Sequence, residues 1–171
     1  MLYNVAQLLK EPVGSPRRYP VSEEVEFPGE EWGPLRAEGE VSLLRTPRGI
    51  LVQAGIRTAL AEQCGRCLEP YTQEITAEIE EEFLPITDVN TGLPLRLPRD
   101  EETFLIDERH LLDLTEALRQ AVWVSRPLQC LCRPECPGFC PECGQDLNRG
   151  ACGCAQAPGD PRWEQLKKLL A

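Results

Sequence analysis

The sequence lacks any apolar run of the roughly 18 residues that a membrane-spanning helix needs. Residues 1–10 also lack the basic stretch followed by an apolar one that marks a secretory leader. We therefore expect a cytoplasmic protein with no membrane partner. With 171 residues and 42% hydrophobic content, the chain can form one packed domain and a small appendage.

Histidine is nearly absent, and positive charge is in the minority. The one histidine, His110, precedes a predicted helix, where we expect an exposed or capping role rather than a catalytic one. The net charge is −10, and residues 126–171 carry six basic and five acidic groups, which leaves 12 basic and 23 acidic groups for the rest. Because an acidic body repels phosphate, any RNA contact should be local, and residues 126–171 are the better candidate for it.

Cysteine, by contrast, is abundant, with nine residues in all, seven of them between Cys130 and Cys154. Cytosolic thiols stay reduced, so a dense cluster favours a metal site over a disulfide framework, and an odd total fits complete pairing poorly. The Cys-Pro-Glu-Cys-Gly motif at residues 140–144 has the form of a zinc knuckle. In a knuckle, two thiolates three positions apart hold one ion, and the glycine permits the tight turn.

Eight of the cysteines form four close pairs, which predicts two metal sites with four ligands each. One site is consecutive in the sequence and the other joins distant pairs: Cys140, Cys143, Cys152 and Cys154; and Cys64, Cys67, Cys132 and Cys136. The second site would pin the C-terminal segment to the body. The alternative is a single zinc on the four central cysteines, with the first pair merely reduced: Cys132, Cys136, Cys140 and Cys143. Cys130 belongs to neither arrangement.

A zinc ion held by four cysteines is structural, because no coordination position remains for water or substrate. This argues against hydrolytic chemistry, and iron is a chemically possible replacement at the same spacing. Cys64-Gly-Arg-Cys67 also has the spacing of a thiol redox protein. However, it lies between two predicted strands and not at a helix N-terminus that would lower a thiol pKa, so redox chemistry is the lesser alternative.

Alternation of period two predicts strands at residues 19–27, 35–45 and 49–64, and a further strand that ends near Phe83. Residues 46–49 have turn composition and suit a hairpin. Alternate apolar residues share one face of the two longest strands: Ile50, Val52, Ala54, Ile56, Thr58 and Leu60, then Ile75, Ala77, Ile79 and Phe83. We interpret the glutamates opposite them as a solvated face rather than a catalytic or cation site.

Three helices are predicted, at residues 3–10, from Asp113 to Arg126, and from Asp160 to the C-terminus. A long mobile loop is expected at residues 84–103, which are rich in proline and glycine. The predicted fold class is α+β. Residues 1–125 should form an acidic antiparallel sheet body with helices, and residues 126–171 a cysteine-rich, zinc-binding C-terminal module with a terminal helix.

The motifs follow one another in a fixed series, in which an acidic strand comes after the first: Cys64-Gly-Arg-Cys67-Leu-Glu-Pro70, Leu112-Asp113-Leu114, Cys132-x3-Cys136-Pro-Gly-Phe-Cys140-Pro-Glu-Cys143-Gly-x2-Leu147-Asn148, Cys152-x-Cys154 and Asp160-Pro161-Arg162. This series resembles the YceD family of bacterial and plastid proteins over about residues 35–170. The resemblance implies a ribosome-assembly factor that supports accumulation of large-subunit ribosomal RNA. It implies no catalytic residues, and it assigns no role to Cys130.

Together these observations predict a non-enzymatic protein with one or two structural zinc ions and no small-molecule substrate. Its partner would be precursor ribosomal RNA, or a ribosomal or assembly protein. The candidate residues for direct RNA contact are basic: Arg66, Arg133, Arg149, Arg162, Lys167 and Lys168. In the alternative, the chain is a protein-interaction adaptor whose acidic sheet face recruits a basic partner without RNA contact.

Overall fold

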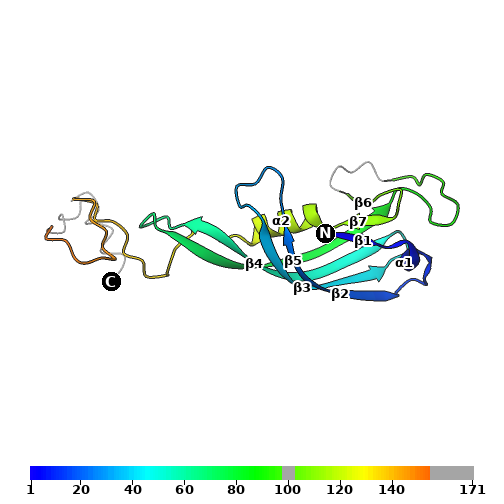
Figure 1. Ribbon diagram of the computed structural model, residues 1–171, viewed down its shortest axis with the longest axis horizontal. Helices are drawn as coiled ribbons and strands as arrows, with labels where there is room; N and C mark the ends of the chain where they lie inside the picture. The colour runs from blue at the N-terminus through cyan, green and yellow to red at the C-terminus, as the bar shows by residue number, and fades with distance from the viewer. Residues whose placement is uncertain (98–102, 155–171) are drawn as a thin grey trace, which may run out of the picture.

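One curved sheet of seven strands organises the protein (Figure 1). The computed structural model describes residues 1–97 and 103–154. The sheet order is β1-β7-β6-β5-β4-β3-β2, and the strands are β1 (Leu2–Asn4), β2 (Pro16–Val25), β3 (Leu35–Arg45), β4 (Ile50–Gln63), β5 (Pro70–Pro85), β6 (Phe104–Ile106) and β7 (Leu111–Asp113). Every neighbouring pair is antiparallel except β5 and β6, which are parallel. The expected antiparallel sheet is therefore a mostly antiparallel one.

The long strands β3, β4 and β5 follow the alternation in the sequence. Their predicted inward faces are buried, and Ile50, Ile56 and Leu60 are each 0% exposed. The turn between β3 and β4 is a tight hairpin in which the Thr46 N–H donates to the Gly49 carbonyl at 3.0 Å. The glutamates on the other face of β5 are mostly exposed, as expected for a solvated face.

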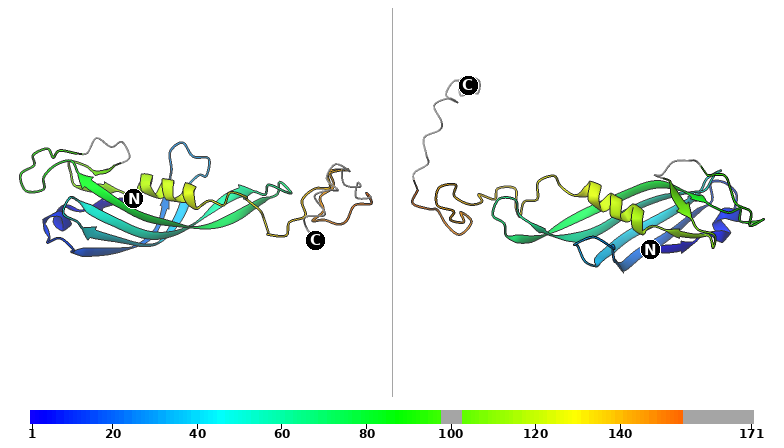
Figure 2. Two further views of the ribbon diagram at one scale, coloured as in Figure 1. Left: turned by 180° about the vertical axis from the view of Figure 1, so that it is seen from behind. Right: turned by 90° about the horizontal axis from the view of Figure 1, so that it is seen from above.

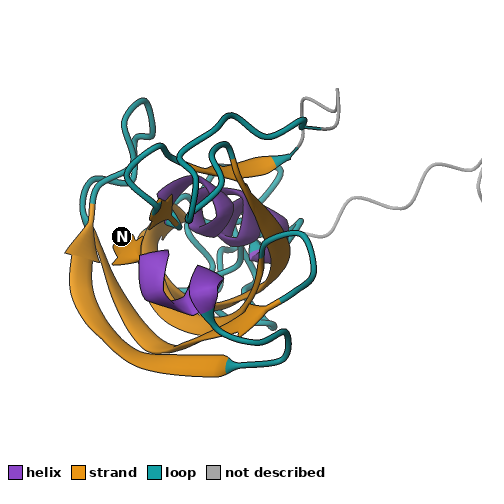
Figure 3. Cartoon of the chain, turned by 90° about the vertical axis from the view of Figure 1, so that its right-hand side faces the viewer, coloured by secondary structure: helices purple, strands orange, loops and turns teal. Residues whose placement is uncertain are grey.

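The described residues contain two helices, α1 (Ala6–Lys10) and α2 (Thr115–Ser125). The sheet curls around α2 as a half-barrel (Figure 3). Ala117, Leu118 and Val122 of α2 are buried against the inward face of the sheet and complete the core. No described helix has the length and apolar character needed to cross a membrane.

Some predicted elements differ at their ends. The first helix is shorter than predicted because Asn4 belongs to β1, from which its side-chain oxygen accepts the Ala6 N–H at 3.1 Å. The second helix begins at Thr115, whose N–H donates to the Asp113 carboxylate at 3.0 Å, and it ends at Ser125, with the predicted end residue Arg126 as its extended C-cap. The predicted third helix lies outside the described residues.

The segment predicted as one long loop contains more regular structure than expected. Strand β5 continues to Pro85, an isolated bridge joins Thr87 to Pro94, and β6 begins at Phe104. Strands β6 and β7 were not predicted, since three residues are too few to show an alternation.

Strands β4 and β5 extend beyond the rest of the sheet. The pairing of β3 with β4 ends at Glu38 and Arg57, whereas β4 and β5 stay paired as far as Gln63 and Pro70. We call β4 residues 58–63, the turn 64–69 and β5 residues 70–75 the hairpin arm. Figures 1 and 2 show the arm reaching away from the body toward the Cys-rich segment, residues 130–154.

Candidate metal centres

The tip of the hairpin arm meets the Cys-rich segment in a group of four cysteines, which we call the first cluster: Cys64, Cys67, Cys132 and Cys136. Their sulfur atoms all lie within 4.8 Å of one another. The Cys64 and Cys136 sulfurs are 3.8 Å apart, and those of Cys67 and Cys132 are 3.7 Å apart. A tetrahedral zinc site with Zn–S bonds of about 2.3 Å has S···S edges of about 3.8 Å. The donor set and its spacing therefore fit zinc.

The arm presents its two cysteines through a tight turn between β4 and β5. The Leu68 N–H donates to the Cys64 carbonyl at 2.9 Å, and Leu68 itself adopts a positive φ of 59°. Hydrogen bonds from the backbone N–H groups of Cys132 and Cys67 lower the pKa of Cys64 to about 6. Such donors favour the thiolate, which is the form that binds metal.

A second cluster lies wholly within the Cys-rich segment, and its four sulfur atoms also lie within 4.8 Å of one another: Cys140, Cys143, Cys152 and Cys154. The Gly144 N–H donates to the Cys140 carbonyl at 2.9 Å, and the positive φ of 73° at Gly144 is one that glycine adopts without strain. Backbone N–H groups of Cys143 and Glu142 lower the pKa of Cys140 to about 7. This is the knuckle geometry that the sequence motif predicts.

The structure groups the cysteines into the same two sets of four as the preferred sequence arrangement. The cysteines of the alternative single site are divided, with Cys132 and Cys136 in the first cluster and Cys140 and Cys143 in the second. Cys130 lies in neither cluster, but its carbonyl accepts the Gly65 N–H at 2.8 Å and so joins the Cys-rich segment to the arm.

Close backbone contact holds the Cys-rich segment on the turn of the arm. Gly138 has a φ of +69°, and a Cβ at this position would lie 2.8 Å from the Arg66 carbonyl oxygen. The Arg66 side chain donates to the Cys136 carbonyl at 2.8 Å. Only a residue without a side chain fits between these two backbones.

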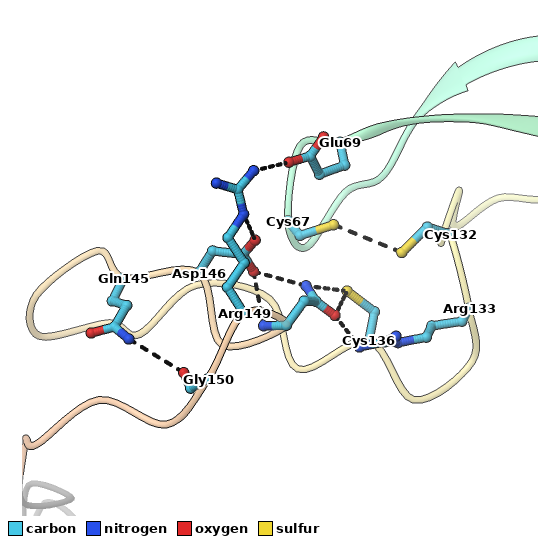
Figure 4. A network of polar contacts seen from close by, with 10 residues as sticks. Cys67, Glu69, Cys132, Arg133, Cys136, Gln145, Asp146, Arg149 and Gly150 are labelled. Carbon is cyan, nitrogen blue, oxygen red and sulfur yellow. Dashed lines mark hydrogen bonds and ion pairs between the residues drawn. The ribbon is translucent and has the colours of Figure 1, made fainter.

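Residues 146–149 lie between cysteines of the second cluster in the chain, and Figure 4 shows Asp146 and Arg149 close to Cys136 of the first cluster. The Asp146 carboxylate accepts the Asn148 side-chain and backbone N–H groups, both at 2.9 Å. The Asn148 side chain in turn donates to the Cys136 sulfur at 3.6 Å. The contact of this segment with the first cluster was not predicted, because the spacing of cysteines carries no signal for it.

The three described basic residues proposed for RNA contact all make internal contacts. Arg149 donates to Glu69 of the arm at 3.0 Å and lies 3.4 Å from Asp146 (Figure 4). Arg133 donates to Asn148, and Arg66 to the Cys136 carbonyl. The other three candidates lie outside the described residues: Arg162, Lys167 and Lys168.

A further contact that the sequence did not reveal ties the end of α2 to the arm, close to its turn. Arg126 forms an ion pair with Glu62, whose side chain is 7% exposed, and the second of their hydrogen bonds measures 2.8 Å. The Arg126 guanidinium also lies 4.9 Å from the centre of the Trp123 ring. The chain therefore enters the Cys-rich segment from a fixed position.

Comparison with known proteins places these features in a family. Residues 52–170 match the family model described as "Large ribosomal RNA subunit accumulation protein YceD". Uncharacterised proteins of Mycobacterium tuberculosis and Mycobacterium bovis are each 32% identical over 131 residues, which cover 71% of this chain and 56% of theirs. An uncharacterised protein of Mycobacterium leprae is 26% identical over 151 residues, covering 82% of this chain and 62% of its own length. The chain thus spans little more than half of these relatives, and no solved structure matches it.

Proposed function

Because this chain belongs to the YceD family, we propose that it supports the accumulation of large-subunit ribosomal RNA as a non-enzymatic assembly factor in the cytoplasm. The observation that carries the proposal is the extent of the family match. It covers most of β4, the arm, α2 and both clusters. The description of the family names a role in ribosomal RNA accumulation and no reaction.

In this proposal the two clusters hold structural zinc. Four thiolates would fill the coordination sphere of each ion and leave no position for a substrate. The first cluster joins residues about 70 positions apart in the chain, so its metal would fix the Cys-rich segment on the arm. Cys64 and Cys67 are 0% and 3% exposed, which also disfavours the thiol redox alternative, since exchange requires an accessible sulfur.

Electrostatics favours a protein partner over direct RNA contact by the described residues. A zinc ion with four thiolates carries a net charge of −2, which repels phosphate as the acidic body does. The guanidinium groups of Arg66, Arg133 and Arg149 are engaged in holding the Cys-rich segment together. Direct RNA contact would therefore depend on the candidates beyond residue 154.

The second candidate function is the adaptor, in which a basic ribosomal or assembly protein is recruited by charge. The outward faces of β3, β4 and β5 favour it, because carboxylates outnumber guanidinium groups there: Glu38, Glu40, Glu74, Glu78, Glu80 and Glu82, against Arg36 and Arg57. Both versions place the chain in assembly of the large subunit. They differ in whether RNA or protein is touched.

The test of the proposed function is complementation in cells depleted of this protein. We expect wild-type protein and Cys130→Ser to restore the level of large-subunit ribosomal RNA, and Cys64→Ser to fail while the small-subunit RNA is unchanged. Purified Cys64→Ser should contain about one zinc fewer per chain by mass spectrometry. Full complementation by Cys64→Ser would argue against a role for the first cluster in fixing the Cys-rich segment on the arm. An unchanged RNA ratio on depletion would argue against the proposed function.

A filter-binding titration against ribosomal RNA fragments over a salt series separates the two versions. Direct contact predicts an affinity that falls steeply as salt rises. The adaptor version predicts no such affinity for RNA. It predicts instead that a partner protein still co-purifies after nuclease treatment.

A further inference from the structure

The hairpin arm has one open backbone edge. In an antiparallel pair, residues whose backbone groups bond to the partner alternate with residues whose groups point the other way. The bonded pairs Thr46–Gly49 and Cys64–Glu69 fix this alternation at the two ends of β4. With the recorded register, even-numbered residues of β4 bond to β5, and odd-numbered ones point toward β3.

Beyond Arg57, however, β3 is no longer paired with β4. The N–H and C=O groups of Ala59, Ala61 and Gln63 therefore point along an edge for which the described residues supply no backbone partner. All three residues are exposed. The next odd-numbered residue, Gly65, donates its N–H to the Cys130 carbonyl at 2.8 Å, so the edge is closed at the tip of the arm and open along its length.

The surroundings of this edge suit one kind of strand. A groove lies at the fork where β3 leaves β4, and it is lined by Arg36, Glu38, Arg57, Ala59 and Glu74 among others. On the outward side, Ala59 and Ala61 are short, and Glu74 is the β5 partner of Ala59.

The inward side of the fork is buried in the body. Leu60 is 0% exposed, and Thr58 is 8% exposed with a hydroxyl that has no partner among the described residues. A strand added here would therefore place one set of alternate side chains beside the row of Thr58 and Leu60, and the other set on the outward side, where Glu74 lies.

We propose that this edge, residues 59–63 of β4, binds an extended basic segment of another protein by strand addition. The segment alternates apolar residues, which lie on the side of Thr58 and Leu60, with arginine or lysine residues, which lie over the short alanines beside Glu74. A second copy of this chain is disfavoured as the occupant, because edge-to-edge pairing would extend one acidic face with another. The inference rests on the adaptor version of the proposed function for the partner's chemistry.

The probe is a fluorescent ten-residue peptide of alternating valine and arginine, titrated into the purified full chain. Its control has the same composition arranged in two blocks, so that the charge is equal and the alternation is lost. We expect the alternating peptide to bind about tenfold more tightly than the block peptide. Only the alternating peptide can form the backbone hydrogen bonds and also place its arginines on the outward side. Equal binding of the two peptides, or none, would overturn the proposal.

Amide hydrogen exchange by NMR gives the direct signature. On peptide binding, the amides of Ala59, Ala61 and Gln63 should become protected, whereas Leu60 and Glu62, already bonded to β5, should change little. Protection confined to other residues would place the peptide elsewhere and refute strand addition.

Two variants extend the test. Ala61→Pro removes an N–H that points to the edge and spares the bonds to β5, so the peptide should bind about tenfold more weakly. Ala59→Lys keeps the backbone and adds a charge at the edge that repels the basic peptide. Gln53→Lys is the control, because it adds the same charge on the same face of β4 at a position where both β3 and β5 are paired with the strand. We expect a clear loss for Ala59→Lys and binding within about twofold of wild type for Gln53→Lys. Equal loss in the two lysine variants would show charge attraction without strand addition. Because this test uses purified protein and no RNA, its failure is distinguishable from failure of the proposed function.

Discussion

Gly138→Ala is the sharpest test of how the Cys-rich segment sits on the arm. A residue with a side chain in the left-handed region costs about 1–2 kcal/mol relative to glycine. In addition, the new Cβ would lie 2.8 Å from the Arg66 carbonyl oxygen, which is closer than van der Waals contact permits. Both atoms are held by backbone, so neither can rotate away, and the two segments must separate.

Gly144→Ala is the matched control. Gly144 has nearly the same conformation, with a φ of +73°, but a Cβ there would meet nothing within 4 Å. It should therefore carry the conformational cost alone, about 1 kcal/mol, which weakens zinc binding at the second cluster about fivefold. Gly138→Ala carries that cost and the overlap, together about 2–4 kcal/mol, so zinc at the first cluster should bind about 30-fold more weakly or worse.

The assay is zinc release from the loaded protein into a graded series of chelator. Thiols that become reactive are labelled and located by mass spectrometry. In Gly138→Ala we expect Cys64 and Cys67 to be labelled first, and in Gly144→Ala we expect Cys140 and Cys143. If zinc at the two clusters is weakened by the same factor relative to wild type, the contact between Gly138 and Arg66 does not hold the segment, and the docking described above is wrong.

Three further predictions concern the body and the metal. Arg126→Ala should lower the free energy of unfolding by about 1–3 kcal/mol at pH 7, because it leaves the nearly buried Glu62 carboxylate unpaired. Hydrogen bonding to Arg126 lowers the pKa of Glu62, so the stabilisation by this pair is fully present above the unfolded pKa of about 4.3. The difference in unfolding free energy between Arg126→Ala and wild type should therefore shrink as the pH falls below about 4. Leu118→Ala should cost about 3 kcal/mol in urea unfolding, whereas Val124→Ala, at a position that is 86% exposed on the same helix, should cost less than about 0.5 kcal/mol. Purified protein should contain two zinc ions and one reactive thiol, Cys130, and five reactive thiols with one zinc would instead select a single site.

The long strands could be predicted because alternate residues are buried along β4 from Ile50 to Leu60, and along parts of β3 and β5. Strands β1, β6 and β7 have three residues each, and they are strands because of their neighbours in the sheet. Nothing local shows that Phe104 lies beside Phe83 in parallel pairing. For the same reason the inward face of β4 could be predicted from its own alternation. The end of the pairing between β3 and β4 at Arg57 could not, because it depends on contacts between strands.

At the clusters, spacing of the cysteines was sufficient to group them, because close pairs can reach one ion only in a few ways. It could not show why Gly138 must be glycine, since the reason is the Arg66 carbonyl, 72 positions earlier in the chain. Nor could it show that Asn148 contacts the first cluster while lying between cysteines of the second. Metal occupancy of both clusters is a prediction, and it is tested by counting zinc ions in the purified protein.

The clusters and the open edge are physically connected. A two-stranded hairpin is marginally stable in water, and the arm consists of two strands beyond Arg57. The arm is held by the ion pair of Glu62 with Arg126 close to its turn, and at its tip by the first cluster. Removing zinc would release the tip, so the edge would spend more time disordered, and the peptide would have to order it on binding. We therefore expect chelation to weaken binding of the alternating peptide about tenfold, although no cysteine lies on the edge, and readdition of zinc to restore it. Unchanged affinity after chelation would mean that the body alone keeps the arm extended. The first cluster would then dock the Cys-rich segment without ordering the edge.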